Sequence, residues 1–551
     1  MIRKYNYKRR ATDCVRIGNV EVGGGNPVRL QSMNNTSTLD TAGSAAQAER
    51  IAEAGGEIVR LTTQGEREAA NMAEIKKALK ARGCDVPLVA DVHFNPRAAH
   101  VAATTCDKVR INPGNFADAA RTFKQLEFTD EEYAAELQRV RERVVPFLEL
   151  CRENGVAVRI GVNHGSLSDR IMSRYGDTAP GMTESAMEYL RIAREIGFGD
   201  IVLSVKSSNV VVMTETVRML REAMEKEGMQ FPLHLGVTEA GDGEDGRIKS
   251  AVGIGTLLAE GLGDTIRVSL SEDPELEIPV AALLRDHIAR RAGHAPIAEP
   301  ATEAPYPARA QSLPLSKESY PLVAGYDFKA EELNPHYIDA SAEPELLGDE
   351  RPIVLTSGHV NAPGEMASWI ERFLALGGKN PIVLKLSYDE TPGLKPEHKT
   401  SKEIKEEIEV KAAADFGALL LWGYGNAIWL DAPELTQEER DSIALGILQA
   451  VRLRVSRTEY ISCPSCGRTL FDLQKTLKEV KEATAHLKGL KIGVMGCIVN
   501  GPGEMADADY GYVGAGPGRV SLYKGKQLMV KNIPTEEALP ALLALIEEER
   551  D

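Results

Sequence analysis

The sequence has no long hydrophobic run, little cysteine and no excess of positive charge. No segment approaches the roughly 18–20 consecutive apolar residues that a membrane-spanning helix needs, so we expect no membrane association. The formal net charge of −16 argues against a general nucleic-acid-binding surface. Any anion-binding site must therefore be a local cluster of basic residues in an acidic protein.

Seven cysteines in 551 residues are too few, and too unevenly spread, for the disulfide framework of a secreted protein. The basic start, Met1–Tyr5, is not followed by the apolar core of a signal peptide, which predicts a cytoplasmic protein. Three cysteines gather near the end of the sequence. We interpret the other four as buried, inert thiols: Cys14, Cys84, Cys106 and Cys151.

Short β-branched runs alternate with helical stretches over the first half of the chain, which predicts a parallel sheet built by right-handed crossovers. Eight such units in about 250 residues match a (β/α)8 TIM barrel. An open doubly wound sheet is the alternative, but Gln31–Thr36 after the first run is not a glycine fingerprint. The expected strands are Pro27–Met33, Glu57–Thr63, Pro87–His93, Lys108–Gly114, Ala157–Asn163, Asp200–Ser208, Pro232–Thr238 and Asp264–Leu270.

A change in composition separates the predicted barrel from the second half of the chain. Residues 292–318 are rich in proline and alanine and are typical of a linker. New strand-like runs come after it, in a segment that contains all three tryptophans, which indicates a separate core. We predict a barrel domain at 1–291, a linker with an α/β insertion domain at 292–436, and a connecting helix with an α+β cysteine-bearing domain at 437–551.

Cations occur inside the predicted strands, where apolar residues would pack better. Burying a charge costs several kcal/mol unless it is paired, and the active sites of such barrels form at the carboxyl ends of the strands. Five cations therefore predict an anionic ligand, and their number favours a diphosphate. The alternative is an internal salt-bridge lattice with Glu57, Asp91, Asp107 and Glu239. The five cations are Arg60, Arg110, Arg159, Lys206 and Arg267.

Neutral polar residues further along the same strands could orient the ligand by hydrogen bonds. His93 and His164 also end strands, and the pattern does not distinguish a catalytic from a structural role for them. Glu239 would repel an anion, so it either neutralises excess charge or transfers protons, and we favour the proton role. The neutral residues are Asn112, Asn163, Ser204, Thr238 and Ser269.

The three late cysteines predict a metal centre. Cys463 and Cys466 form a Cys-x-x-Cys pair, and Cys497 lies in a glycine-rich loop. Structural zinc sites close with four Cys or His ligands, and the nearest histidine, His486, falls in a predicted helix at Thr476–Leu487. Three thiolates instead suit an iron–sulfur cluster with one open iron, for which Glu504 is the candidate fourth ligand. We also expect a helix from Thr469 onward, whose N-terminal dipole would favour an anionic cluster.

These residues resemble a known family. Cys463-Pro464-Ser465-Cys466-Gly467-Arg468 and the run from Gly496 to Glu504 closely resemble the cluster motifs of the 4-hydroxy-3-methylbut-2-enyl diphosphate synthase (GcpE) family. The predicted barrel agrees, in Ala90–Phe94, Arg110–Asn115, Gly161–Ser166, Leu235–Gly241 and Arg267–Leu270. The compact bacterial form of the family lacks an equivalent of about 292–436, so the chain resembles the three-domain form, with no plastid transit peptide before the barrel.

The resemblance implies a substrate, 2-C-methyl-D-erythritol 2,4-cyclodiphosphate, and a two-electron reductive ring opening with loss of water. It also implies a [4Fe–4S] cluster held by Cys463, Cys466, Cys497 and Glu504, with ferredoxin or flavodoxin as the electron donor. The five barrel cations would hold the diphosphate and Glu239 would assist proton transfer. The protein would be a monomer or a homodimer, and its barrel would face either its own cluster domain or a partner's.

Two other interpretations stay open on the residues alone. The barrel could be a metal-independent lyase or aldolase, with Lys206 as a Schiff-base nucleophile and zinc on the cysteines. The insertion could be a spacer that lets one chain's own domains meet, which we favour, or a module that binds the electron donor.

Overall fold

The computed structural model of the protein describes residues 4–118, 127–301, 319–388, 399–498, 501–505 and 507–548. These residues form three large sheets and one two-stranded hairpin. They fall into two compact units, each discontinuous in sequence. The first unit comprises Met1–Arg10, Gly243–Leu262 and Ala282–Ser456, and the second comprises Ala11–Asp242, Gly263–Ala281 and Arg457–Asp551.

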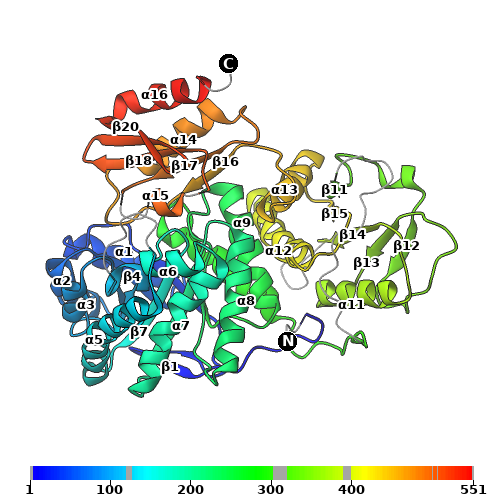
Figure 1. The fold of residues 1–551 in the computed structure, drawn as a ribbon. Helices are drawn as coiled ribbons and strands as arrows, with labels where there is room; N and C mark the ends of the chain where they lie inside the picture. The colour runs from blue at the N-terminus through cyan, green and yellow to red at the C-terminus, as the bar shows by residue number, and fades with distance from the viewer. Residues whose placement is uncertain are drawn as a thin grey trace. The chain divides into compact units, whose positions relative to one another are not determined.

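The second unit contains an eight-stranded parallel sheet, which confirms the predicted barrel (Figure 1). Each strand pairs in parallel with its neighbours. A parallel bridge between Leu203 and Leu233 closes the ring, so the open-sheet alternative is wrong. In order around the barrel, the strands are β8 (Ile201–Lys206), β7 (Ala157–Asn163), β6 (Lys108–Ile111), β5 (Leu88–Val92), β4 (Ile58–Thr63), β3 (Arg29–Met33), β10 (Thr265–Ile266) and β9 (His234–Leu235).

Helices come after the barrel strands, as the alternating pattern predicts. The longest begins with a capping box in which Thr129 and Glu132 satisfy each other's backbone amides, and it ends at Gly155 in a left-handed conformation. The helices that come after strands β3 to β8 are α1 (Thr41–Glu53), α2 (Glu66–Ala81), α3 (Pro96–Ala102), α4 (Pro113–Phe116), α5 (Asp130–Asn154), α6 (Asp169–Tyr175), α7 (Ala179–Glu195) and α8 (Val210–Lys226).

A hairpin that the sequence analysis did not predict covers the amino end of the barrel. It consists of β1 (Cys14–Ile17) and β2 (Val20–Gly23), paired antiparallel. Its apolar side chains share a buried cluster with Ile58, Val89 and Val202, which begin or lie near the beginning of three barrel strands. Because the hairpin covers this end, the ligand site is expected at the carboxyl ends of the strands, as in other barrels of this kind.

The four isolated cysteines do not share one environment. Cys14 is exposed on the hairpin, so its predicted burial is wrong. Cys106 and Cys151 are buried as predicted, and burial raises the pKa of each of these two thiols to about 12. Cys84 is only partly buried. The inert character expected of buried thiols therefore applies to Cys106 and Cys151.

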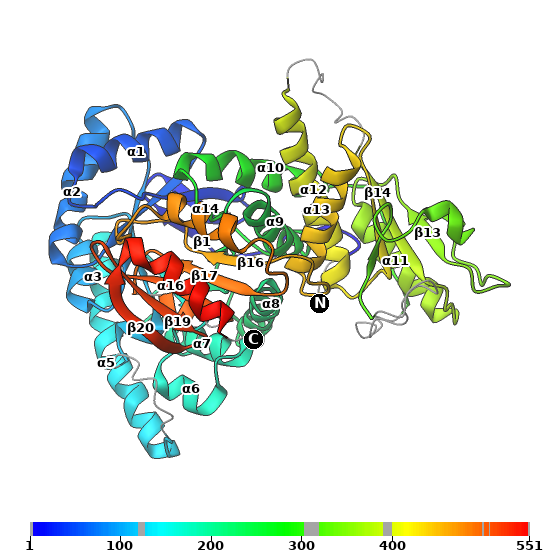
Figure 2. The same cartoon turned by 90° about the horizontal axis from the view of Figure 1, so that it is seen from above.

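The predicted insertion forms a parallel five-stranded sheet in the first unit, with its own core. Trp369 and Trp422 are fully buried there. Figure 2 shows its helices beside the sheet. The strands, in spatial order, are β11 (Leu322–Val323), β15 (Ala427–Asp431), β14 (Ile382–Ser387), β13 (Ile353–Thr356) and β12 (His336–Asp339). The helices are η2 (Ala330–Leu333), α11 (Ala362–Ala375), α12 (Ser401–Leu421) and α13 (Gln437–Ala450).

The first unit also includes α9 (Gly243–Ala259), which comes after β9 along the chain and packs against α12 and α13. The chain segment after β10 contains η1 (Pro274–Leu276) and α10 (Glu277–Ala289). The predicted bounds of the three domains stay a prediction, and most of the predicted linker, 302–318, lies outside the described residues.

The C-terminal segment forms a mixed five-stranded sheet in the same unit as the barrel. Its first three strands are parallel and its last three antiparallel. Apolar residues of α14 and α16 pack with its strands in one core. The elements are β16 (Glu459–Ser462), α14 (Leu473–Thr484), β17 (Lys491–Met495), α15 (Gly501–Glu504), β18 (Tyr510–Gly516), β19 (Arg519–Lys524), β20 (Gln527–Pro534) and α16 (Thr535–Glu547).

Two details of this domain differ from the sequence analysis. The helix after the cysteine pair begins at Leu473, not at Thr469, because Asp472 caps it by accepting a hydrogen bond from the Lys475 amide. Its dipole therefore does not start beside the cysteines. His486 lies in a turn after the end of α14, so its predicted helical position is wrong. No helix among the described residues is both long and apolar enough to cross a membrane.

Candidate active site

A pocket at the carboxyl ends of the barrel strands is lined by both the barrel and the C-terminal domain. One chain thus provides both walls, so in this structure the barrel faces the cysteines of its own chain. Six cations and two carboxylates line the pocket. The barrel contributes Met33, Arg60, Asp91, His93, Arg110, Arg159, Asn163, Lys206, Thr238, Glu239, Arg267 and Ser269. The C-terminal domain contributes Cys463, Pro464, Ser465, Cys466, Arg468, Thr469, Met495, Cys497 and Gly501.

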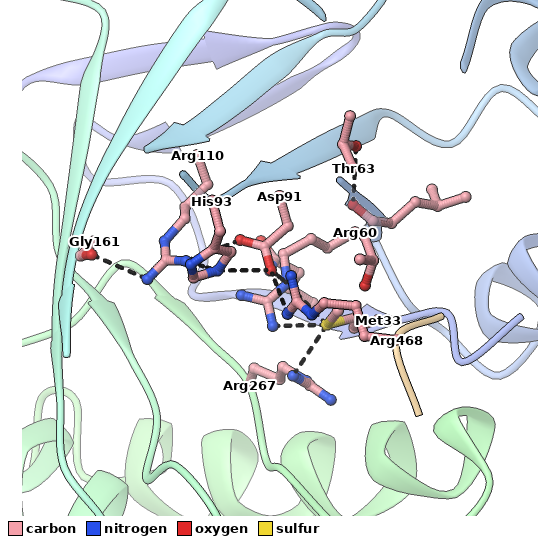
Figure 3. A network of polar contacts seen from close by, with 12 residues as sticks. Met33, Arg60, Thr63, Asp91, His93, Arg110, Gly161, Arg267 and Arg468 are labelled. Atoms are coloured by element: carbon pink, nitrogen blue, oxygen red, sulfur yellow. Dashed lines mark hydrogen bonds and ion pairs between the residues drawn. The ribbon is translucent and has the colours of Figure 1, made fainter. Parts of the chain in front are cut away.

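Asp91, at the end of β5, is the carboxylate around which the cations gather (Figure 3). Arg110 donates to it at 3.1 Å, and Arg60 lies 4.0 Å away. Burial would raise the pKa of this carboxyl, but Arg60 and Arg110 outweigh burial and hold the pKa well below its usual range. The predicted lattice is thus partly present. Of its other proposed carboxylates, Glu57 pairs with Arg29 and Asp107 with Lys76 instead.

The predicted cations differ in how well protein groups satisfy them. Arg267 forms two hydrogen bonds to the buried carboxylate of Glu277, at 2.9 and 3.0 Å. Arg60 lies against the sulfur of Met33. In contrast, Nε and Nη1 of Arg159 are buried and have no hydrogen-bond partner among the described residues. Arg159 is therefore the barrel arginine with the largest unmet demand for an anion.

Lys206 lies near Arg159 at the end of β8. It forms no ion pair within the described parts of the chain, and burial together with Arg159 and Arg60 lowers the pKa of its amine well below the usual range. A bound anion would reverse part of this shift, because it would stabilise the ammonium form. The excess of cations over carboxylates thus gives the pocket the electrostatic character of an anion site.

Two of the five neutral candidates do not line the pocket. The side-chain oxygen of Asn112 accepts a hydrogen bond from the Gly114 amide and caps α4. Ser204 is buried in the middle of β8. Asn163 accepts a hydrogen bond from Arg110 at 3.0 Å, and Thr238 and Ser269 line the pocket. That these five residues bind a ligand stays a prediction. The positions of Asn112 and Ser204 are explained by the fold alone, the first as a helix cap and the second as a buried strand residue.

The histidines that the sequence left undecided have different surroundings. Nε2 of His93 accepts a hydrogen bond from Arg110 inside the pocket, so the imidazole is neutral. Burial and Arg110 lower its pKa to about 3. His164 lies outside the pocket lining, 3.8 Å from Asp177. His93 is therefore the histidine placed to contact a ligand.

Glu239 lies after β9 in an unusual environment. Its backbone φ is +49°, a conformation that costs a non-glycine residue free energy and often marks a functional position. Its side chain is buried, and Oε2 has no hydrogen-bond partner among the described residues. The next residue, Ala240, forms a parallel bridge with Ser462 of β16. The loop that carries Glu239 is thus held against the strand that ends just before Cys463.

The three predicted cysteines line the same wall of the pocket. The Gly496 amide donates to Sγ of Cys463 at 3.3 Å, a contact typical of sulfurs bound to iron. Burial and the neighbouring Cys466 raise the pKa of the Cys463 thiol. No three His, Cys, Asp or Glu side chains in the described parts of the chain are gathered closely enough to hold a single metal ion. A four-iron cluster spaces its ligands farther apart than one ion does. The side chain of Glu504 lies outside the described residues.

Further contacts, which the sequence did not reveal, hold the two domains together. Oγ of Ser271, after β10, is 2.7 Å from Oγ of Ser462 and donates to the Cys463 carbonyl at 2.9 Å. Lys481 pairs with Asp242. A further close approach joins the loop after β7 to α15, since a Cβ added to Gly165 would lie 2.1 Å from the carbonyl oxygen of Gly503. The cysteine loop and the segment around Gly503 are therefore both held close to the barrel mouth.

Comparisons with known proteins agree with this architecture. Residues 12–282 match the GcpE TIM-barrel domain, and residues 459–548 match the GcpE protein C-terminal domain. The 4-hydroxy-3-methylbut-2-en-1-yl diphosphate synthase (flavodoxin) of Parabacteroides distasonis is 50% identical, covering 99% of each chain. The protein of the same name from Bacteroides fragilis is 51% identical, covering 99% of this chain and 97% of its own.

A more distant relative of the same name, from Akkermansia muciniphila, is 43% identical over 99% of this chain and 97% of its own. Among solved structures, the sialic acid synthetase of Leptospira borgpetersenii matches 53% of this chain and 93% of its own with a TM-score of 0.34 and 11% identity, a likeness too low to carry an argument.

The fold and the pocket define a class of protein, namely a barrel enzyme with an anion-binding mouth that faces a thiol-bearing second domain. The match over both domains and the identity over nearly the whole chain are more specific. The chain belongs to the GcpE family, the 4-hydroxy-3-methylbut-2-en-1-yl diphosphate synthases.

Proposed function

We propose that the protein converts 2-C-methyl-D-erythritol 2,4-cyclodiphosphate into (E)-4-hydroxy-3-methylbut-2-enyl diphosphate, with flavodoxin as the electron donor. The balanced reaction takes up two electrons and two protons, opens the ring and releases one water. The observation that carries the proposal is the shared pocket, in which a cationic barrel mouth faces three thiols. The names of the relatives supply the product and the donor.

The cations of the barrel hold the diphosphate. Arg159 and Lys206 support this role most strongly, because both are buried without an ion-pair partner in the described structure. Arginine can bind two phosphate oxygens at once through its planar fork. Arg110, whose guanidinium already contacts Asp91 and Asn163, orients the ligand within a fixed network.

The residues present fit a [4Fe–4S] cluster. Cys463, Cys466 and Cys497 would hold it, and the amide of Gly496 already points at one sulfur. Glu504 is the candidate fourth ligand, on the strength of its spacing from Cys497 alone. When bound, the cluster supplies the two electrons one at a time. The pocket walls keep these thiols facing the bound diphosphate and limit the access of water.

Glu239 carries the proton that the departing oxygen needs. Its buried and unpartnered Oε2 faces a pocket rich in cations. Replacement of Glu239 by Gln should lower kcat by about 100-fold or more, as loss of a general acid does, while substrate binding stays within a few-fold. Glu153→Gln, an exposed change on α5, is the matched control. Normal turnover by Glu239→Gln would refute the proton role.

Anaerobic purification followed by turnover with reduced flavodoxin tests the proposed function. The protein should be brown and contain about four irons per chain, and the product should be identified by its mass. A colourless protein with one tightly bound zinc and no turnover would refute the proposal. That result would favour the lyase alternative, in which the uncharged amine of Lys206 is the nucleophile.

A further inference from the structure

Arg468 is a pocket cation whose role the sequence analysis did not assign. It lies two residues after Cys466, in the loop that leads from β16 to α14. The loop passes close over the segment after β3, since a Cβ added to Gly467 would lie 2.8 Å from the carbonyl oxygen of Thr36. This close approach directs the next side chain into the barrel mouth, where that of Arg468 is only 8% exposed.

Protein groups satisfy the guanidinium of Arg468 only in part: it lies beside Asp91 and the Cys466 thiol, and two of its nitrogens lack a partner in the described parts of the chain. Its Nη2 lies 3.8 Å from Asp91, beyond hydrogen-bond distance. Its Nε and Nη1 are buried and have no hydrogen-bond partner among the described residues. Figure 3 shows the side chain entering from the C-terminal segment and lying beside Arg60 near Asp91.

Asp91 cannot balance this charge alone. It already accepts a hydrogen bond from Arg110 and faces Arg60, so one carboxylate serves three guanidinium groups. Burying several cations around one carboxylate is costly, and an anion placed between Arg468 and the barrel arginines would offset that cost. Arg468 differs from the other five cations in belonging to the C-terminal domain.

We propose that Arg468 binds the diphosphate of the substrate directly, so that the anion is held by cations from both domains. The proposal rests on the proposed function and adds a substrate contact to it. A ligand bound by cations of both domains also fixes the position of the cysteine loop over the barrel mouth. Arg468 thereby couples the binding of the anion to the position of Cys463 and Cys466.

The test compares Arg468→Gln and Arg468→Lys in the anaerobically purified holoenzyme. Loss of a charged hydrogen-bond donor should raise both KM and the Kd of the cyclodiphosphate by roughly 10- to 100-fold, with the iron content unchanged. Arg468→Lys keeps the charge but not the fork, so it should recover part of the affinity. Arg519→Gln removes an exposed cation of the same domain and should behave as the unaltered enzyme.

A purely structural role predicts a different result. If Arg468 only anchored the loop to Asp91, Asp91→Asn and Arg468→Gln would lower kcat or iron content alike and leave KM and Kd within about twofold of the unaltered enzyme. That pattern, with no rescue by Arg468→Lys, would overturn the proposal. Absence of turnover in the unaltered holoenzyme would instead overturn the proposed function, so the two failures are distinguishable.

Discussion

Single residues in the pocket show how the barrel tolerates so much buried positive charge. Glu277 neutralises Arg267, and Asp91 serves the group around Arg110, but no described carboxylate reaches Arg159 or Lys206. The unpaired groups lie on β7 and β8. The cations that attract an anion most strongly, Arg159 and Lys206, therefore lie on neighbouring strands at one side of the barrel mouth.

His93 gives this network a defined pH dependence. Its pKa of about 3 in the folded protein lies below the ordinary value of 6.5. Between these values the unfolded chain binds a proton that the folded protein excludes, so this histidine lowers stability as the pH falls. The limiting slope is about 1.4 kcal/mol per pH unit. When the pH is lowered from 6.5 to 5, the free energy of unfolding of His93→Gln should therefore fall by about 1–2 kcal/mol less than that of the unaltered protein.

The measurement is the urea midpoint of unfolding at several pH values, converted to a free energy of unfolding. His100→Gln is a suitable control, because His100 lies on α3 outside the pocket. An unchanged pH slope for His93→Gln would show that folding does not lower the pKa of this histidine. The groups that face His93 are Arg110, Asp91 and Arg468.

At the residue scale, the position of the cations could be predicted from the sequence, since a charged residue inside an apolar strand is visible without a structure, while their role in binding stays a prediction. Each of the five lines the pocket. The sequence could not reveal that Glu277 pairs with Arg267, because that contact depends on how the turn after β10 leads into α10. Arg468 stood in the cysteine motif, but only the domain contact shows where its side chain lies.

At the scale of elements, the loop after β7 and the short helix α15 meet through two glycines. Gly165 has a φ of +78°, and a side chain there would collide with the backbone of Gly503. Gly165→Ala should therefore displace α15 from the barrel, and kcat/KM should fall by about 100-fold, the scale of loss expected when reacting groups are misplaced by about 1 Å.

Gly155→Ala provides a matched control. Gly155 also has a positive φ, +63°, but nothing lies within 4 Å of an added Cβ. The control carries the same backbone cost, about 1–2 kcal/mol, without the collision. Small-angle scattering and kcat/KM measured on both variants separate the two effects. Equal losses in both variants would mean that the contact between Gly165 and Gly503 is unimportant.

The barrel strands were the most predictable elements, because strands buried on both faces form continuous apolar runs. β7 has the predicted bounds. The predicted runs at 232–238 and 264–270 form only two-residue strands, and their later residues Thr238, Arg267 and Ser269 line the pocket. The helix predicted from Thr469 starts later because the cysteine loop takes up those residues.

At the scale of the whole molecule, α9 belongs to the barrel sequence but is buried against helices of the insertion. Every residue from Gly246 to Ala259 is buried, and a Cβ added to Gly255 would lie 2.7 Å from that of Ala414 on α12. Removing residues 319–436 would therefore expose an apolar helix face. Such a deletion cannot separate a spacer from a donor-binding module, and both roles stay predictions.

A substitution at this contact is a cleaner test of the packing. Ala414→Leu should lower the free energy of unfolding of the first unit by about 1–3 kcal/mol, because the added carbons have no space. Ala375→Leu, at an exposed position of α11, should change it by less than about 0.5 kcal/mol. All three tryptophans belong to this unit, so tryptophan fluorescence reports on it selectively. Equal midpoints for the two variants would contradict the close packing.

The packing of α9 against α12 also bears on how such a chain can change over generations. A helix encoded between two barrel strands has its surface matched to a segment encoded more than 100 residues later. The insertion therefore cannot be gained or lost without matching changes on the surface of α9. A lineage that discards it must first acquire polar residues along α9, and substitutions at Gly255 should be accompanied by substitutions at Ala414.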